Sequence, residues 1–388
     1  MAVIPNQCKF HVVSDSVNTT DKGSSQFQSQ RASVSMQDII DTIGPDSTGP
    51  FEYGSGGDTS IVPKQGTNTA TQSFSAVIGG LNNDVTRLRS QIFGGESNTL
   101  SALGNDNVIL GGRSNQVIGG GAGYNNGGHM VSGGFDNSID LTTSQNQAPH
   151  TIVGGKNNQM TLAALCSQYS YYSNQILGGS YNTITANYGY TQNNTIVGTV
   201  YGEITRNVVA NGLYFGHNSL LGSCDVSITD SDYSSVIASR GSSITQAQNN
   251  VILGSSFSST QLSAYPNAYN NVNFIIGGEA NAINGYTSQS GIIGGSLNTL
   301  YGAVKRGAII GGYFNDMNVL SFDSAIIAGQ NNAIVNDRSV IVGGQAITTD
   351  RDNTLFCENL SIKGIPTSSA GLPSGSVWSN SGVLNIVP

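Results

Sequence analysis

The sequence predicts an all-β fold in which most of the chain forms a parallel β-roll, that is, a β-solenoid of short stacked strands. From residue 75 onward the chain keeps returning to the phrase hhGGxxNxh, where h is apolar, as in VIGGLNNDV, IFGGESNTL and IIGGSLNTL. The apolar positions are mostly Val and Ile and show no 3.6-residue period, which favours strands over helices. Self-similarity at a short period is typical of solenoid proteins.

Fifteen copies of the phrase align on the first glycine position, which we call the anchor. The anchors are Gly79, Gly94, Gly111, Gly133, Gly154, Gly178, Gly198, Gly216, Ala238, Gly254, Gly277, Gly294, Gly311, Ala328 and Gly343. Successive anchors are 15 to 24 residues apart, which indicates one structural unit that carries loop insertions of variable length. The alignment is weakest at Gly198, Gly216, Ala238 and Gly254, where the second glycine and the asparagine are lost.

The two residues before the anchor predict contacts between chains. The position two before it is Val or Ile in every copy except Tyr214, and the position one before it is apolar in every copy except Ser132. Neighbouring strand residues face opposite sides, so two adjacent apolar positions predict a strand buried on both faces. One face can line the interior of the coil. We expect the other face to be covered by further copies of the chain around a common axis.

The polar residues of the phrase are expected to build the turns. At anchors such as Gly79, Gly94 and Gly111, glycine permits a positive φ and a close approach of backbone. The asparagine four residues on, including Asn98, Asn115 and Asn298, tolerates the left-handed conformation and can bond turn carbonyls. Stacked turns should therefore align these amides into a ladder.

The phrase at this spacing resembles the head repeats of trimeric autotransporter adhesins and the related repeats of phage tail fibres. The resemblance covers roughly residues 75 to 349. It implies a left-handed parallel β-roll with three chains around one axis, and hence a homotrimeric fibre. The ending LSIKGIPTSSAGLPSGSVWSNSGVLNIVP is similar to terminal segments of structural proteins from marine phages and large DNA viruses.

These resemblances imply a virion structural protein, located in the virion as a fibre or appendage that serves host attachment. We expect no secretion signal, coiled-coil stalk or carboxy-terminal membrane barrel, which an adhesin would carry. The expected partners are two further copies of the chain, other virion proteins, and a host surface receptor or glycan. A bacterial surface adhesin is an alternative function.

Three regions are expected. Residues 1–74 lack the repeat and should form an adaptor to the particle, with a strand in PNQCKFHVVS and a short helix in SMQDIIDTIGP. Residues 75–349 form the repeat shaft. Residues 350–388 should form a cap, in which SVWSNSGVLNIV is a β-hairpin that turns through Ser379 to Gly382 and is anchored by Trp378.

Composition argues against several other classes of protein. Fifteen basic and 23 acidic residues give a net charge of -8, so no nucleic-acid partner is expected. No apolar run of 18 residues is present, so membrane insertion is not expected. The four cysteines form no CxxC pair and the four histidines no HxH or HxxxH spacing, so we expect neither a metal site nor a cofactor.

The sequence predicts no enzymatic activity. The alternative is a tailspike-like polysaccharide depolymerase with paired carboxylates, for which Asp230 with Asp232 and Asp350 with Asp352 are candidates. Both pairs lie in polar turns, where acidic residues are common in any case. The run GGGAGYNNGG has glycines spaced as in phosphate loops, but no GK[ST] follows, which favours a turn.

Receptor or glycan binding has its best candidates in three insertions that collect tyrosine. Exposed aromatic side chains provide contact area at small entropic cost and can stack on sugars. The candidates are Tyr169, Tyr171, Tyr172, Tyr188, Tyr190, Tyr265 and Tyr269, together with Trp378 in the cap. The alternative is that these tyrosines pack along the rod.

Overall fold

The computed structural model describes residues 10–12, 32–34, 50–57 and 59–388, with short gaps. The gaps are residues 102–104, 120–127, 142–148, 155, 162–172, 179, 187–192, 199–201, 207–216, 223–225, 230–232, 238–239, 246–248, 263–271 and 319–320. Every regular element among the described residues is a β-strand. The chain divides into unit 1, Met1–Phe274, and unit 2, Ile275–Pro388.

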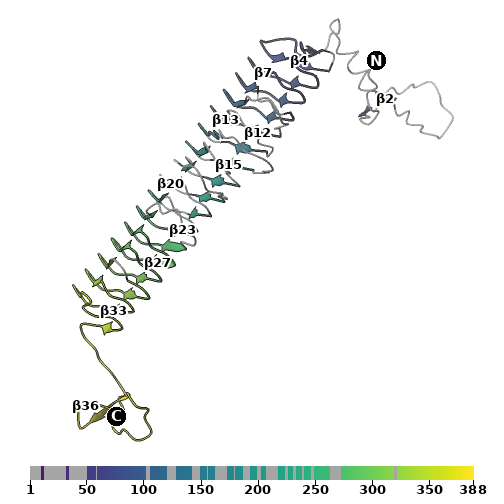
Figure 1. The fold of residues 1–388 in the computed structure, drawn as a ribbon. Helices are drawn as coiled ribbons and strands as arrows, with labels where there is room; N and C mark the ends of the chain where they lie inside the picture. Colours follow the sequence, from purple (N-terminus) through teal and green to yellow (C-terminus); the bar gives the residue numbers. More distant parts are fainter. Residues whose placement is uncertain are drawn as a thin grey trace, which may run out of the picture. The chain divides into compact units, whose positions relative to one another are not determined.

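Unit 1 contains a parallel β-solenoid in which each coil contributes a strand to two sheets (Figure 1). The first sheet contains β4 (Ile61–Pro63), β6 (Ala76–Val77), β8 (Gln91–Ile92), β10 (Val108–Ile109), β12 (Met130–Ser132), β14 (Thr151–Val153), β15 (Gln175–Leu177), β17 (Thr195–Val197), β19 (Ser219–Leu221), β21 (Ser235–Ile237) and β23 (Asn250–Leu253). The second sheet contains β5 (Thr69–Ala70), β7 (Asp84–Val85), β9 (Thr99–Leu100), β11 (Gln116–Gly119), β13 (Ser138–Leu141), β16 (Thr183–Ala186), β18 (Gly202–Arg206), β20 (Val226–Thr229), β22 (Ser243–Thr245) and β24 (Ser259–Leu262).

Unit 2 repeats this architecture. Its first sheet contains β27 (Ser290–Ile293), β29 (Ala308–Ile310), β31 (Ala325–Ile327), β33 (Val340–Val342) and β34 (Leu355–Phe356). Its second sheet contains β26 (Ala282–Gly285), β28 (Thr299–Gly302), β30 (Asp316–Asn318) and β32 (Ala333–Ile334). Strand β25 (Asn273–Ile276) contains the boundary between the units. The parallel solenoid predicted from the repeat is confirmed in both units.

The core of each solenoid is the predicted aliphatic column. The residue two before the anchor points inward from the first sheet, and the residue six after it points inward from the second. In unit 2, Ile292, Ile309 and Ile326 pair in register and are fully buried. Opposite them lie Leu300 and Met317, also buried. At about 1.5 to 3 kcal/mol for each buried aliphatic side chain, this interior is the main apolar contribution to stability.

The strands of the solenoid extend beyond the residues that show the phrase. In unit 1, β4 already pairs with β6 through Ile61 and Ala76, and β3 (Phe51–Tyr53) pairs antiparallel with β4. In unit 2, β34 adds a coil after Gly343. Separately, β1 (Phe10–Val12) pairs antiparallel with β2 (Ala32–Val34), so the strand predicted in PNQCKFHVVS is confirmed. The predicted helix lies outside the described residues.

One predicted anchor is wrong. Strand β17 pairs with β19 so that Ile196 lies beside Leu220 and Val197 beside Leu221. The anchor of this coil is therefore Gly222, which has a φ of 56°, and not Gly216. The two aliphatic positions before Gly222 are both Leu and not Val or Ile. The upstream segment YFGH also has two apolar residues before a glycine, as the phrase does, and the alignment therefore selected Gly216.

The turn after the anchor also differs in detail from the prediction. The left-handed residue is the one before the asparagine of the phrase, as at Ser97 (φ 57°) and Ser114 (φ 55°), so the left-handed role proposed for the asparagine is wrong. Close backbone approach occurs at the second glycine and not at the anchor: a Cβ on Gly95 would lie 3.0 Å from the Gly112 nitrogen, whereas a Cβ on Gly94 would meet nothing within 4 Å.

Candidate functional site

The recurring asparagines of the phrase form a buried ladder inside the turns. Asn98 is fully buried, and its Nδ2 donates to the carbonyl oxygens of Gly94 and Gly112, each at 3.1 Å. Its Oδ1 accepts the backbone N–H of Asn115 at 2.9 Å. Asn298 repeats the pattern in unit 2, accepting from the backbone of Asn315 at 3.0 Å. At Asn98 and Asn298 the ladder satisfies buried backbone groups of the turns, as expected from the sequence.

A second polar ladder is formed by the residues that lie directly before the strands of the first sheet or begin them. It was not predicted from the sequence. It occupies the position four before the anchor, where each side chain accepts the backbone N–H of its successor. Its members in unit 1 include Ser90, Asn107, His129, His150, Asn174, Asn194, Asn218, Ser234, Asn250 and Asn273. The signal was present, because short polar residues recur at this position.

Two histidines replace asparagine within this second ladder. His129 and His150 are fully buried, and their rings stack with centroids 5.2 Å apart and planes 2° apart. Burial lowers the pKa of His129 to about 4. Burial, and then the neighbouring His129, lower the pKa of His150 well below its ordinary value. Both rings are therefore neutral at pH 7.

The outward face of the first sheet is a mostly aliphatic surface that also contains Phe93 and is interrupted at Ser132. The residue one before the anchor, predicted to be buried between chains, is partly exposed in the single chain, and Ile293 is 42% exposed. The same column includes Ile78, Phe93, Leu110 and Leu253 in unit 1 and Ile310, Ile327 and Val342 in unit 2. Ordinary soluble monomers rarely expose contiguous apolar surface of this kind.

The outward face of the second sheet has a polar stretch in unit 1, whereas Ile118 and Tyr301 elsewhere on that face are apolar or aromatic and exposed. From β16 to β24 in unit 1, the outward residues carry hydroxyl groups at all positions except Glu203 and Gln261. They are Thr183, Thr185, Thr205, Ser227, Thr229, Ser243, Thr245 and Ser259. Neighbouring hydroxyls contact one another, as in Ser243 and Thr245 at 3.2 Å. From β16 to β24 the outward face of the second sheet therefore differs chemically from the apolar outward face of the first.

The tyrosine-rich insertions all fall between a strand of the second sheet and the next strand of the first. The other corner, from anchor to asparagine, keeps a constant length. Tyr188 and Tyr190 follow β16 and precede β17, and Tyr265 and Tyr269 follow β24 and precede β25. These four residues, and Tyr169, Tyr171 and Tyr172 before β15, lie outside the described residues. Their role in binding stays a prediction.

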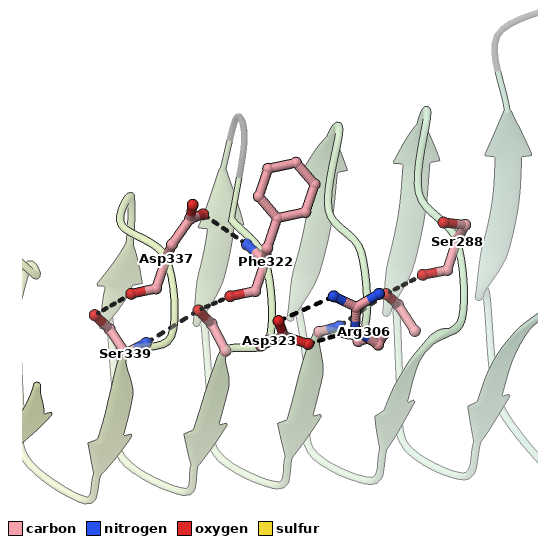
Figure 2. A network of polar contacts seen from close by, with 9 residues as sticks. Ser288, Arg306, Phe322, Asp323, Asp337 and Ser339 are labelled. Atoms are coloured by element: carbon pink, nitrogen blue, oxygen red, sulfur yellow. Dashed lines mark hydrogen bonds and ion pairs between the residues drawn. The ribbon is translucent and has the colours of Figure 1, made fainter. Parts of the chain in front are cut away.

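In unit 2 this second corner is short and held by polar contacts (Figure 2). The Arg306 guanidinium pairs with Asp323 through two contacts, one of them 2.9 Å long. The hydrogen bond from Arg306 holds the pKa of Asp323 below its ordinary value. The Asp337 carboxylate accepts the Phe322 backbone N–H at 2.9 Å, and Ser339 Oγ donates to the Asp337 carbonyl at 3.1 Å. The Arg306–Asp323 and Phe322–Asp337 contacts join adjacent coils, whereas the Ser339 contact lies within one coil.

The carboxylates considered for catalysis have structural partners where they are described. Asp350 pairs with Arg351 at 2.8 Å, and that hydrogen bond lowers the pKa of Asp350. Asp352 accepts the backbone N–H of Asp337 at 3.0 Å. A glycosidase acid requires a raised pKa, so Asp350 has the opposite environment. Asp230 and Asp232 lie outside the described residues.

The cap region contains the predicted hairpin. Strands β35 (Val377–Asn380) and β36 (Val383–Ile386) pair antiparallel, with Ser381 (φ 52°) and Gly382 (φ 88°) at the turn, one residue later than expected. Trp378 is half-buried opposite Asn385. Val377, Leu384 and Ile386 share one face of the hairpin and are exposed, which differs from a self-contained cap. A two-stranded hairpin on its own is only marginally stable, so packing of this exposed apolar face against a partner would stabilise it.

No protein-family model matches the chain, and a search of curated proteins gives no match either. Across the residues that the structure describes, no helix is long and apolar enough to cross a membrane. No group of three or more His, Cys, Asp or Glu side chains in that part of the chain could hold a metal ion.

Proposed function

We propose that the chain is a non-enzymatic structural protein that assembles as a homotrimeric fibre or appendage of a virus particle and serves host attachment. The observation that carries the proposal is the aliphatic outward face of the first sheet. It coexists with a fully buried interior in the same strands, so the apolar residues on this face are not needed to close the coil.

Sister chains are the occupants that fit this face best. The face repeats the same aliphatic position coil after coil, so a second copy in the same orientation presents a matching surface at the same spacing along the solenoid. A cyclic arrangement of three copies covers all three faces and leaves the hydroxyl-rich second sheets outward. The resemblance to trimeric fibre repeats supports three as the number.

Host attachment is proposed for the outward surfaces of this assembly. The hydroxyl face of β16 to β24 is almost uncharged, which suits a neutral glycan, and the tyrosine-rich insertions leave the solenoid at the edge of that face. The part of residues 1–74 that precedes β4 is proposed to hold the fibre on the particle through other virion proteins. The exposed face of the β35–β36 hairpin is proposed to contact its equivalents in the trimer.

Particles that carry Tyr171→Ala together with Tyr172→Ala should adsorb to host cells at least tenfold more slowly, because two aromatic contacts of about 1 kcal/mol or more each are lost. Adsorption is measured as unadsorbed infectious particles against time. The matched control is Tyr286→Ala, a half-exposed tyrosine of unit 2 outside the insertions. Normal adsorption by the double variant would contradict the binding role, and loss of the oligomer would show that these tyrosines pack along the fibre.

A further inference from the structure

We propose that His129 and His150 form an acid-labile joint in the wall of the unit 1 solenoid. Protonation of the two rings removes two acceptors of the second polar ladder, so that the coils beginning at β12, β14 and β15 open in acid while other coils stay closed. The inference depends only on the geometry of unit 1 and is independent of the proposed function.

The ladder requires both rings to be neutral. The backbone N–H of His150 donates to Nδ1 of His129 at 3.2 Å, and the backbone N–H of Asn174 donates to Nδ1 of His150 at 3.2 Å. A protonated imidazole carries N–H groups at both ring nitrogens and accepts no hydrogen bond. After protonation, Nδ1–H of each ring would face the backbone N–H of the next coil, so two hydrogen bonds in successive coils would be replaced by contacts between two donors. An asparagine in the same column keeps its acceptor at every pH.

The surroundings of the two rings also disfavour the positive charge that protonation would create. Both rings are fully buried, and they stack face to face at 5.2 Å, so the second proton would enter beside the first. Nε2 of His129 is buried and has no hydrogen-bond partner among the described residues. The ring therefore has no acceptor nearby that would stabilise a cation.

The charged side chains of the surrounding coils are few, and they lie away from the two rings, so they would not stabilise a protonated ring. Between residues 105 and 174 they are Asp106, Arg113, Asp136, Asp140 and Lys156. Asp106 pairs with Arg89 at 2.9 Å, and Asp140 points outward from the second sheet. Arg113 and Lys156 lie over the rings of Phe135 and Tyr181 in the anchor turns, where Asp136 also lies. The insertions 120–128, 141–149 and 161–173 contain no Asp, Glu, Lys or Arg.

The direction of the effect follows from linkage. The pKa of each buried ring lies below the ordinary value of 6.5, and that of His129 is about 4. The neutral rings therefore stabilise the native coils fully above pH 6.5, and this contribution is lost as the pH falls from 6.5 through about 4. Strands β12, β14 and β15 each follow an insertion, so opening there releases the attachment points of three insertions, including the one with Tyr169, Tyr171 and Tyr172.

Hydrogen–deuterium exchange on the full-length protein at pH 7 and pH 4 tests the joint, with rates corrected for intrinsic exchange. In the wild type, the amides of β12, β14 and β15 should lose protection at least tenfold at pH 4, while the strands of unit 2 change little. The variant His129→Asn/His150→Asn uses the residue found at Asn107 and Asn174 of the same column. It should keep its protection at both pH values.

Unchanged protection of the wild-type strands at pH 4, or an equal loss in wild type and variant, would overturn the proposal. Should the double variant not fold, NMR titration of the wild-type histidine ring protons decides the question. Two histidines that titrate far below 6.5, together with loss of the β12 to β15 amide signals, support the joint. Two histidines that titrate near 6.5 without such loss contradict it.

Discussion

Replacing Gly95 with alanine should destabilise the unit 1 solenoid by about 2 to 5 kcal/mol, because the second glycine of the phrase is where adjacent coils approach each other closely. Gly95 has a φ of 92°, and an added Cβ would overlap the Gly112 carbonyl oxygen and lie 2.6 Å from Nδ2 of Asn98. The neighbouring coil cannot retreat, because its position is fixed by the hydrogen bonds of the ladder. Chemical denaturation followed by circular dichroism measures the loss.

Gly94→Ala is the matched control, since the two glycines are adjacent. Gly94 has no positive φ, and a Cβ there would meet nothing within 4 Å, so the change should cost less than about 1 kcal/mol. Equal stability of the two variants would show that the second glycine is not the point of closest approach between coils.

Replacing Asn332 with aspartate should cost at least about 3 kcal/mol at pH 7, because it buries a carboxylate among carbonyl oxygens. Nδ2 of Asn332 donates to the carbonyls of Gly343 and Gly344 at 3.2 and 3.3 Å, while its Oδ1 accepts from the Ile347 backbone at 2.9 Å. Aspartate keeps the shape and the acceptor but loses the donor. The cost should shrink as the pH falls, because protonating the carboxyl removes the charge and restores one donor.

Asn331→Asp is the control for this change. Asn331 directly precedes Asn332 and is exposed, and its φ of 57° is a conformation that aspartate tolerates. Its substitution should change the free energy of unfolding by less than about 0.5 kcal/mol. Thermal unfolding of both variants at pH 7 and pH 4 checks the pair. A tolerated Asn332→Asp would mean that the amide ladder contributes little to unit 2.

Much of the fold could be predicted because the repeat fixes it locally. The column of Ile292, Ile309 and Ile326 has one residue type at one spacing, and that pattern has few solutions other than stacked parallel strands. The anchor at Gly216 failed because Leu220 and Leu221 are less typical strand residues than Val and Ile. The assignment of the left-handed residue failed because Ser97 and Ser114 carry no glycine or asparagine signal.

The polar ladder through His129 and His150 could not be fully predicted. A recurring Ser or Asn before each strand was visible, but its inward direction depends on where the strand begins. The sequence therefore does not indicate that a histidine in that column is buried. The outward surface is harder to predict than the interior, because the burial of an outward residue such as Ile293 depends on a partner and not on the fold of its own chain.

The most direct test of the trimer is the mass of the full-length protein in solution, measured by sedimentation equilibrium for the wild type and two variants. The wild type should have three times the 40.2 kDa mass of the chain. Ile293→Glu places a charge on the outward face of the first sheet and should reduce the mass toward that of one chain. Tyr301→Glu, at a 53% exposed position on the second sheet of the same coil, should leave the trimer intact. A wild type that sediments as a stable single chain, or equal behaviour of the two variants, would contradict assembly through the first sheet.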